Sequence, residues 1–217
     1  KAMNVAGALS RLMPNVGGPR EAKRRLLASV ANSIVLYGAE VWADELSRKR
    51  LRERITSVQR VGSLRIACAY RTVSTATIMV IARTVPITLL ARERREKFLD
   101  DSERDVERRA RSVQRWQQDW DVAVTGRWTY RLIPVLSTWL GRSHGEVNYY
   151  LTQLLSGHGQ FNAYLHRMRV KASPDCDYCP GVEDTSEHTF FACSRWEPQG
   201  RLLGDRLGTV PTPENIV

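Results

Sequence analysis

The chain has 217 residues, of which 42% are hydrophobic, so it is long enough to bury the core of one large or two small domains. Lys and Arg number 33 against 23 Asp and Glu, and the net charge of +10 favours polyanionic partners such as nucleic acid over acidic ones. No apolar run approaches the roughly 20 residues of a membrane span and no secretory signal pattern is visible, so we expect a protein that neither spans a membrane nor is secreted.

The positive charge is concentrated in the first third of the chain. Residues 1–72 hold 14 basic and 5 acidic residues, a net +9. Only five of the 33 cations are Lys, and Arg is the side chain that binds phosphate bidentately. We therefore expect any nucleic-acid-binding surface to lie mainly here. A solvated basic helix face with no dedicated ligand is the alternative.

Residues 1–85 are predicted to form a basic helical region. A short helix over residues 3–12 is followed by a loop, because Pro14–Pro19 holds two prolines and two glycines. A long helix comes next, with basic residues on its first turns, and Gly38 weakens this helix without necessarily ending it. Its expected apolar stripe is Leu26, Val30, Ile34, Tyr37 and Val41, and its basic residues are Lys23, Arg24 and Arg25.

A second basic helix is indicated by Leu51, Ile55, Val58 and Val61, which recur at helical spacing. A third, shorter helix is predicted over Thr72 to Arg83 and ends before Pro86. The second helix lies in the densest basic region of the chain, which includes Arg48, Lys49, Arg50, Arg52, Arg54 and Arg60.

Residues 86–124 are predicted to form a long charged connector helix. From Ile87 to about Trp120 there is no Gly or Pro, and acidic and basic residues alternate. Ion pairs one helical turn apart would hold such a helix, each contributing about 0.2 to 0.5 kcal/mol. Asp100 and Asp101 are interpreted as part of its solvated face and not as a metal site.

Residues 125–172 are predicted to form a small apolar and aromatic helical region with a second core. Thr125-Gly126 marks its start, and helices are expected from about Glu146 to Leu155 and around Phe161 to Met168. No strand-period segment is found. The predicted fold is therefore mainly α, with a helical bundle, a long charged helix, and a small helical C-terminal region. Its expected core residues are Trp128, Tyr130, Leu132, Ile133, Leu136, Trp139 and Leu140.

Residues 173–200 contain the one strong motif, and residues 201–217 are interpreted as a tail. Cys176, Cys179, His188 and Cys193 form C-x2-C-x8-H-x4-C, a spacing typical of a zinc knuckle. Four protein ligands complete a tetrahedral shell and leave no open position, so Zn²⁺ would be structural here and not catalytic. Phe190, Phe191 and Trp196 are expected to wrap a miniature core. The alternative is free thiols with a surface histidine, or one disulfide with a spare thiol.

The remaining reactive side chains suggest no further site. Cys68 lies in an apolar pattern and is predicted to be buried. His158, between two glycines, is interpreted as structural. His144 and His166 have no catalytic partner at a recognised spacing, and no nucleophile elbow, phosphate loop or HExxH motif occurs. No catalytic residue is therefore assigned.

Several stretches together resemble a known family, the non-LTR retrotransposon reverse transcriptases. Ala8–Pro19 and Leu36–Trp42 look like the segment that follows the catalytic palm of these enzymes. Downstream, Ala67–Ser74, His144–Val147, Gly157–Gly159 and the knuckle with Glu187-His188-Thr189 resemble the arthropod type-1 elements that insert into ribosomal DNA. The resemblance covers nearly the whole chain, and the combination is specific although each piece alone is weak.

The resemblance implies that this chain is the thumb and tail of a longer Pol polyprotein, consistent with its start at Lys1 inside helix-like sequence. An endonuclease and a polymerase, with their Mg²⁺ ions, are expected upstream, because the Tyr/Phe-x-Asp-Asp motif is absent here. The parent would act inside the cell, in the nucleus, at the site of integration. Its expected partners are primer–template, element RNA, chromosomal target DNA and the upstream domains. A thumb holds duplex phosphates, and the candidate contacts are Lys23, Arg24, Arg25, Arg48, Lys49, Arg50, Arg52 and Arg54.

Two other functions remain open from the residues. The chain could be a stand-alone zinc-containing DNA- or RNA-binding module, which explains the charge. It could also be a zinc-stapled helical scaffold that contacts only proteins, which the nearly neutral last third favours. Tyr178, Phe190 and Trp196 would either stack unpaired bases or form the core of the knuckle.

Overall fold

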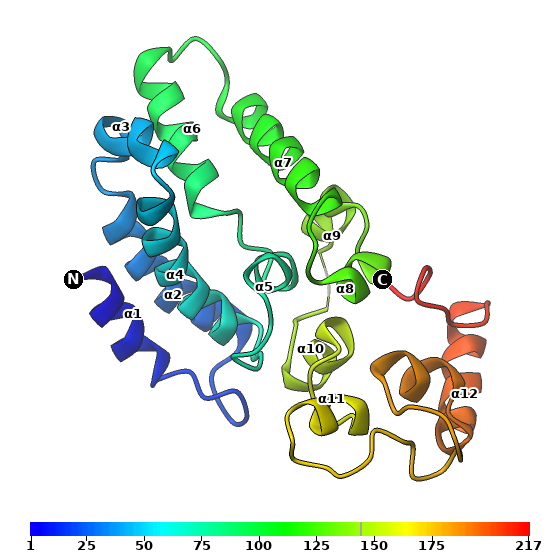
Figure 1. Cartoon of the computed structure of the whole chain (residues 1–217). Coiled ribbons are helices and arrows are strands. Elements are labelled where there is room, and N and C mark those ends of the chain that lie inside the picture. The colour runs from blue at the N-terminus through cyan, green and yellow to red at the C-terminus, as the bar shows by residue number, and fades with distance from the viewer. Residues whose placement is uncertain (144) are drawn as a thin grey trace.

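The computed structural model describes residues 1–143 and 145–217, and within them the chain is helical with no β-strand (Figure 1). The prediction of a mainly α fold is confirmed. His144 lies outside the described residues. No single described helix is long and apolar enough to cross a membrane, although the bent pair Glu21–Leu36 and Ala39–Ser47 meets the length and composition criteria. The helices are α1 (Ala2–Ser10), α2 (Glu21–Leu36), α3 (Ala39–Trp42), η1 (Ala43–Ser47), α4 (Lys49–Ile66), α5 (Thr75–Ile81), α6 (Ile87–Leu99), α7 (Asp105–Asp121), α8 (Arg127–Leu132), α9 (Leu136–Gly141), α10 (Tyr149–Ser156), α11 (Asn162–Arg167), η2 (His188–Ala192), η3 (Ser194–Trp196) and α12 (Glu197–Leu207).

The first hydrophobic core lies between α1, α2, α3, α4 and α6. The apolar stripe predicted for α2 is wrong, since Leu26 is 68% and Tyr37 85% exposed. The helix instead buries a face of small residues that includes Ala28 and Ala31. A Cβ added at Gly62 of α4 would come within 2.9 Å of the Ala28 Cβ. Small side chains therefore let α2 and α4 approach closely, and this packing outweighs burial of the larger stripe.

The predicted continuation of α2 past Gly38 is also wrong. The helix ends at Leu36, and Gly38 adopts a left-handed conformation with φ of +65° before α3 begins. Glycine occupies this region without the steric penalty that a Cβ brings. The chain therefore turns at Gly38, and α3 packs against α6.

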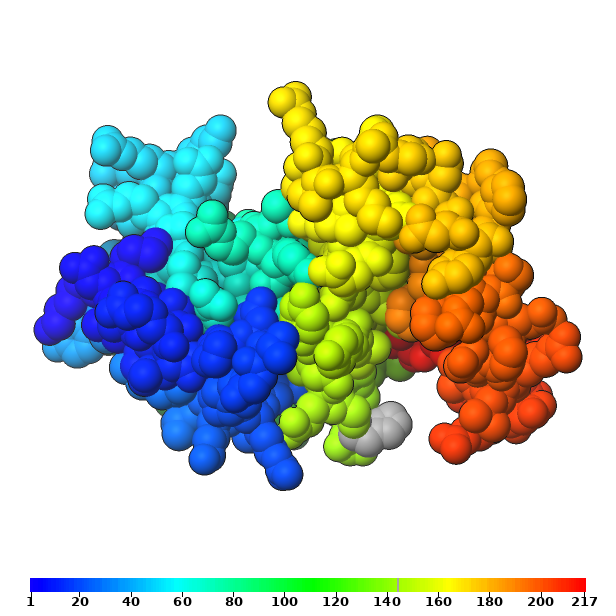
Figure 2. Space-filling view, turned by 90° about the horizontal axis from the view of Figure 1, so that it is seen from below, coloured from blue at the N-terminus to red at the C-terminus, as the bar shows by residue number. Residues whose placement is uncertain are grey.

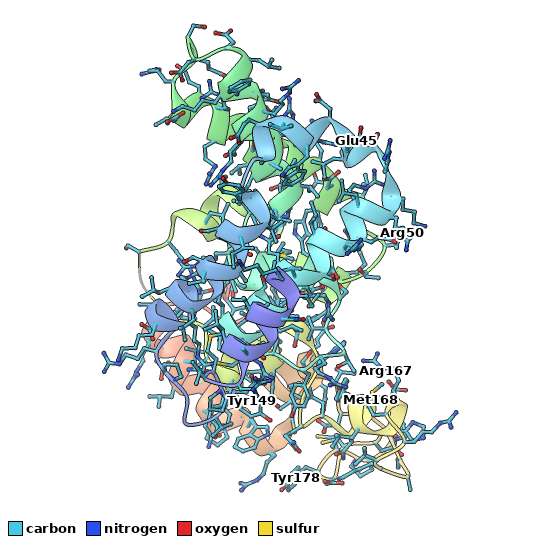
Figure 3. All side chains as sticks on the ribbon, turned by 90° about the vertical axis from the view of Figure 1, so that its left-hand side faces the viewer. Glu45, Arg50, Tyr149, Arg167, Met168 and Tyr178 are labelled. Carbon is cyan, nitrogen blue, oxygen red and sulfur yellow. The ribbon has the colours of Figure 1, made fainter. Side chains whose placement is uncertain are left out.

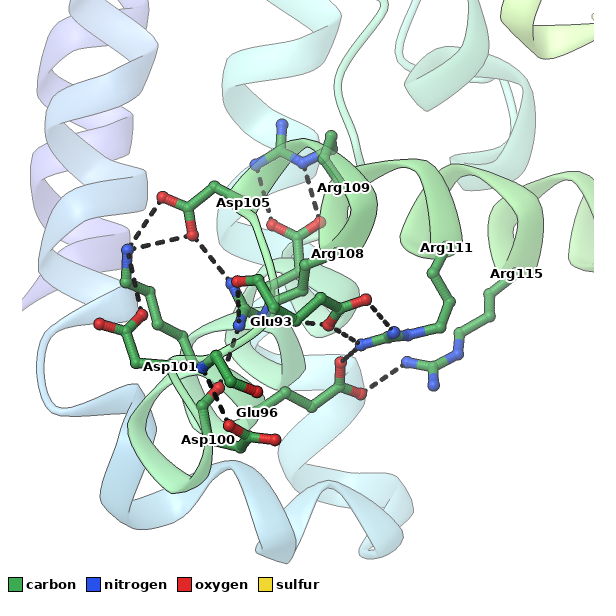
Figure 4. Close-up of polar contacts among 12 residues, drawn as sticks. Glu93, Glu96, Asp100, Asp101, Asp105, Arg108, Arg109, Arg111 and Arg115 are labelled. Atoms are coloured by element: carbon green, nitrogen blue, oxygen red, sulfur yellow. Dashed lines mark hydrogen bonds and ion pairs between the residues drawn. The ribbon is translucent and has the colours of Figure 1, made fainter.

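The single connector helix predicted from Ile87 to Trp120 is two helices. α6 ends at Leu99 and α7 begins at Asp105, and the two run beside each other as a hairpin (Figure 4). The Asp100 carboxylate accepts a hydrogen bond of 2.9 Å from the Ser102 backbone amide, which closes the turn. Asp100 and Asp101 are thus turn residues, and the prediction that they hold no metal site stays a prediction.

Ion pairs across the hairpin explain why the chain folds back. Arg115 contacts Glu96 at 2.8 Å and Arg109 contacts Glu93 at 2.8 Å, each pair joining α7 to α6. Arg111 bridges Glu96 and Glu103 (Figure 4). Acidic and basic residues that alternate along the sequence can form ion pairs within one helix or between two helices, so the charge pattern is compatible with both structures. The hairpin also carries the end of α7 to the second core, where its two tryptophans are buried.

The second core is larger than the sequence predicted. Trp139 and Leu136 belong to the same cluster as Ile78 of α5 and Trp120 of α7. The Trp139 indole donates a hydrogen bond of 2.8 Å to the Val80 carbonyl, so the C-terminal helices are attached directly to α5. The separate small core expected after residue 125 is therefore wrong. The domain limits at residues 85, 124, 172 and 200 stay predictions.

Candidate metal centre and nucleic-acid interface

The four residues of the C-x2-C-x8-H-x4-C motif converge, with one ligand atom from each lying within 4.8 Å of all the others. The Sγ atom of Cys193 lies 3.7 Å from that of Cys176 and 4.0 Å from that of Cys179. Two thiolates on a tetrahedral zinc ion, at Zn–S of about 2.3 Å, are separated by about 3.8 Å. A disulfide needs about 2.05 Å, and all the cysteines are free. The cluster thus fits zinc and not a disulfide.

Two further observations fit a metal. The Nε2 atom of His188 is buried and has no hydrogen-bond partner among the described residues, which is costly unless a cation binds it. The Tyr178 backbone amide donates to the Cys176 sulfur at 3.5 Å, a bond that would stabilise a thiolate. Burial and the neighbouring thiols raise the pKa of Cys193 to about 11, so a bound cation is what would favour the thiolate there.

Short local structures bring the ligands together. An isolated bridge between Asp175 and Glu183 closes the loop that carries Cys176 and Cys179. His188 begins the five-residue π-helical turn η2, and Cys193 follows it. Such turns occur frequently at functional sites because they reposition one side chain within a helix.

The knuckle, residues 173–200, is attached to the helical core by α11. The Asp184 carboxylate accepts from the Asn162 backbone amide at 2.8 Å, and the Asn162 side chain donates to the Asp175 carbonyl at 2.7 Å. Phe191 packs edge-on against Trp128 of α8, with ring centroids 6.4 Å apart. Asn162 and Asp184 were not singled out from the sequence, since their contacts depend on the folded knuckle.

The predicted aromatic wrapping of the knuckle is only partly found. Phe191 is partly buried against the second core, whereas Phe190 and Trp196 are both more than two-fifths exposed. Tyr178 is 57% exposed (Figure 3). The Arg195 guanidinium lies 5.5 Å from the centroid of its ring. Tyr178, Phe190 and Trp196 are therefore surface groups, and only Phe191 serves as a core residue.

Of the candidate nucleic-acid contacts on α2, the structure rules out Arg24. Its side chain is 3% exposed, and its guanidinium donates to the carbonyls of Met13, Pro14, Pro19 and Arg65. Three of these carbonyls belong to residues 13–19, and this loop lines a hollow together with residues 146–150. Figure 2 shows the N-terminal and central segments of the chain meeting on this face. Arg24 is thus a structural clamp and is not available to phosphate.

The other two α2 candidates differ in accessibility. Arg25 is partly buried and donates to Glu21 at 2.7 Å and to the Ala82 carbonyl at 2.7 Å. Lys23 is exposed, and no ion pair is found for it in the described part of the chain. Only Lys23 therefore keeps a charge that is free to meet a ligand.

The five candidates at the start of α4 are all exposed. Arg48 pairs with Glu45 at 2.7 Å, and Lys49 lies 3.8 Å from Glu53. Arg50 and Arg54 have no carboxylate partner among the described residues, and Arg50 projects from the edge of the molecule (Figure 3). This group is the most accessible part of the predicted surface. Whether it binds nucleic acid stays a prediction.

Sequence reasoning missed a set of arginines that lie over aromatic rings. Arg127 lies 3.9 Å from the Tyr130 ring centroid, and Arg167 lies 5.4 Å from that of Tyr164. Both pairs are three residues apart within a helix, a spacing that places side chains next to each other. That spacing was the signal that could have identified them.

The predictions for Cys68 and His158 agree with the structure. Cys68 is buried, and burial raises the pKa of its thiol. The His158 Nδ1 atom lies 3.0 Å from the Thr72 hydroxyl, and burial lowers the pKa of the imidazole to about 4. His158 is therefore neutral at physiological pH and serves as a packing residue.

Known proteins similar to this chain come from one kind of mobile element. No protein-family model and no solved structure matches it. It is 29% identical over 98% of its length to a putative 115 kDa protein in type-1 retrotransposable element R1DM of Drosophila melanogaster. It is 28% identical over 92% of its length to a retrovirus-related Pol polyprotein from type-1 retrotransposable element R1 2 of Nasonia vitripennis.

A similar Pol polyprotein of Bradysia coprophila is 25% identical over 94% of the chain. The chain spans only 23% of the Drosophila protein and 53% of the Nasonia protein, so these relatives are longer. The resemblance predicted from the sequence is confirmed: over most of its length, this chain is homologous to proteins of arthropod type-1 retrotransposable elements R1, Pol polyproteins among them.

Proposed function

We propose that this chain is the nucleic-acid-binding segment of a non-LTR retrotransposon reverse transcriptase and endonuclease. It would hold primer–template and target nucleic acid during target-primed reverse transcription in the nucleus. The polymerase and endonuclease centres, with their Mg²⁺ ions, would lie in other parts of the parent polyprotein. The observation that carries the proposal is the cluster of exposed cations on the first turns of α4.

These cations are placed where helix electrostatics disfavours them. The N-terminus of a helix has a partial positive charge, so a cation there costs about 0.3 to 1 kcal/mol at low salt. The first turn of α4 holds no acidic residue, and Arg48, its N-cap, makes no side-chain capping bond. The helix end and the side chains therefore act together as a positive surface. An arrangement that costs stability but attracts phosphate is expected of a backbone-binding site.

The knuckle would have a structural role in this function. Its four ligands would fill the zinc shell, so the metal would shape the surface that carries Tyr178 and Trp196 and would perform no chemistry. The chain's own residues would act by binding and positioning nucleic acid, and we propose no catalytic group within it.

The test measures the binding of an RNA–DNA duplex by fluorescence anisotropy at salt concentrations between about 50 and 300 mM. Counterion release changes the affinity strongly over this range. Arg48, Lys49 and Arg50 are changed together to Gln. The matched control changes Arg92, Arg104 and Arg206 to Gln, which removes the same charge elsewhere. We expect the first variant to lower the salt slope by roughly 0.9 for each phosphate that is no longer neutralised. Equal affinities for both variants would contradict the proposal.

One observation favours a second function, that of a zinc-stapled helical scaffold. α12 has no buried residue and leaves Leu202, Leu203 and Leu207 substantially exposed. Complete absence of salt-sensitive binding to duplex and single-stranded probes would favour this scaffold over the nucleic-acid-binding segment.

A further inference from the structure

A cleft of about 690 Å³ lies between the helical core and the knuckle. We call it the knuckle cleft. Its walls come from the start of α5, the start of α8, the end of α10, α11 and residues 183–187 of the knuckle, and Figure 1 shows these elements gathered around one region. It lies apart from the basic start of α4 and does not include the predicted metal ligands.

The charge along the knuckle cleft is set by two arginines. Arg127 and Arg167 line it, and neither forms an ion pair among the described residues. Glu187, on the opposite wall, forms an ion pair with Arg131 at 2.9 Å. Glu183 is the other carboxylate in the described lining, and it has no ion pair there. Arg167 is exposed at the edge of the molecule (Figure 3) and offers its whole guanidinium to an anionic ligand. Arg127 offers only part of its own, because its Nη1 donates to three backbone carbonyls at the end of α7, while its Nε and Nη2 have no hydrogen-bond partner among the described residues.

The cleft also offers a flat apolar surface and free hydroxyls. Trp128 lines it, and this indole is held in place by a hydrogen bond of 2.7 Å from its Nε1 to the Leu154 carbonyl. The hydroxyls of Thr125 and Ser186 line it too, with no hydrogen-bond partner in the described part of the chain. A fixed aromatic ring, guanidinium groups and free hydroxyls are the combination that binds the base, phosphate and sugar of an unpaired nucleotide.

We propose that the knuckle cleft binds one or two unpaired nucleotides of single-stranded nucleic acid, with a base against Trp128 and the adjoining phosphates at Arg127 and Arg167. Its volume lies within the range of about 300 to 1,000 Å³ that is typical of sites for small ligands. A site of this size fits an unpaired nucleotide, so a base paired in a duplex would have to flip out of the duplex to enter. The inference rests on the proposed function and deepens it: duplex would bind at α4 and a single strand at the knuckle cleft.

The experiment uses the full chain with zinc bound and a fluorescein-labelled oligouridine RNA as the single-stranded probe. Arg167→Gln is the principal variant, because Arg167 has no hydrogen bond or ion pair among the described residues and its loss should leave the fold intact. Arg206→Gln, an exposed residue of α12, is the matched control. With a salt slope of about 0.7 per neutralised single-strand phosphate, removing one such interaction should weaken binding roughly 5-fold at 0.1 M salt.

A second measurement tests the place of binding directly. RNA carrying 4-thiouridine is photo-crosslinked, and the modified peptide is identified by mass spectrometry. Crosslinks on the peptide that contains Trp128 are expected. Crosslinks confined to α4, or equal affinities of the Arg167→Gln and Arg206→Gln variants for RNA, would overturn the knuckle cleft as a binding site.

The outcomes separate the two proposals. If Arg167→Gln binds both the duplex and the single-stranded RNA normally, the proposal for the α4 surface holds and the proposal for the knuckle cleft is wrong. If the parent protein binds neither probe, both proposals are wrong. If an acidic peptide such as polyaspartate displaces the RNA equally well at equal charge, the cleft recognises anions in general, and the assignment to nucleotides is wrong.

Discussion

The side-chain amide of Asn162 lies 2.7 Å from the backbone oxygen of Asp175, the residue directly before the predicted metal ligand Cys176. Asn162 is buried at the start of α11, and its own backbone amide is bonded to Asp184 of the knuckle. The geometry of the metal site is therefore coupled to the position of α11, and hence to the knuckle cleft that α11 lines.

This coupling predicts the effect of Asn162→Asp, an isosteric change. It removes the hydrogen-bond donor and adds a carboxylate close to Asp177 and Asp184. We expect the free energy of unfolding to fall by about 1 to 3 kcal/mol, because a buried acceptor loses its partner. Zinc should also be released faster to a chelator. Asn4→Asp, on the exposed face of α1, should change unfolding by less than about 0.5 kcal/mol. Similar behaviour of the two variants would show that the hydrogen bond is not important.

The cysteines supply a matched pair for the metal. Cys193→Ser should abolish stoichiometric zinc binding, since it removes one of four ligands from a closed shell. Cys68→Ser should keep one zinc per chain and lose only about 1 to 3 kcal/mol of stability from burying a hydroxyl. Zinc content by mass spectrometry and unfolding in urea measure both effects. One zinc retained in Cys193→Ser would refute the assigned ligand set.

Arg24 and Lys23 are neighbours in sequence with opposite expected behaviour. Arg24→Ala leaves four carbonyl groups without their donor, and we expect a loss of about 3 kcal/mol or more in the free energy of unfolding. Arg24→Lys should recover little, because a single ammonium group cannot reproduce the planar fork. Lys23→Ala should change stability by less than about 0.5 kcal/mol. Urea denaturation of all three variants checks the order.

The features that could be predicted from the sequence are those that depend on residues close together in the chain. The helical class follows from apolar spacing, and the convergence of Cys176, Cys179, His188 and Cys193 follows from C-x2-C-x8-H-x4-C, because each signal lies within a short stretch of the chain. The role of Arg24 was misjudged since one of its partners, the Arg65 carbonyl, is 41 residues away and is brought near only by packing of α2 on α4. The hairpin of α6 and α7 was missed because the same charges fit one helix or two.

Gly18 and Gly7 form another contrasting pair. A Cβ at Gly18 would clash with the Pro14 carbonyl and the Arg24 guanidinium, so Gly18→Ala must displace the clamp. We expect it to destabilise the protein by about 1 to 3 kcal/mol. Gly7 lies within α1 with nothing near its added Cβ, so Gly7→Ala should stabilise by roughly 0.5 to 1 kcal/mol. Thermal unfolding of both variants tests the prediction. Equal effects of the same sign would contradict it.

The ion pairs of the hairpin predict a dependence of stability on pH. Burial by itself would raise the pKa of Glu96, but hydrogen bonds from Arg115 and Arg111 outweigh it and hold the pKa below its ordinary value of 4.5. A carboxyl whose pKa is lowered by folding stabilises the protein above its unfolded pKa. That contribution is lost as pH falls through the lower folded pKa. The hairpin should therefore weaken in the acid range and not near neutral pH.

The variant Glu96→Gln isolates this contribution. It keeps the shape of the side chain and removes the charge, so at pH 7 it should lower the free energy of unfolding by a few tenths to about 1 kcal/mol, as partly exposed pairs do. The difference from the parent protein should begin to shrink near pH 4.5, where the carboxyl of the unfolded chain takes up its proton, and should disappear as pH falls through the lower pKa of folded Glu96. Asp119→Asn is the control, because Asp119 lies on α7 without an ion pair among the described residues. The range from about pH 3 to pH 7 covers the titration of carboxyl groups. A difference in unfolding free energy that stays constant over this range would mean that Glu96 acts through packing and not through its charge.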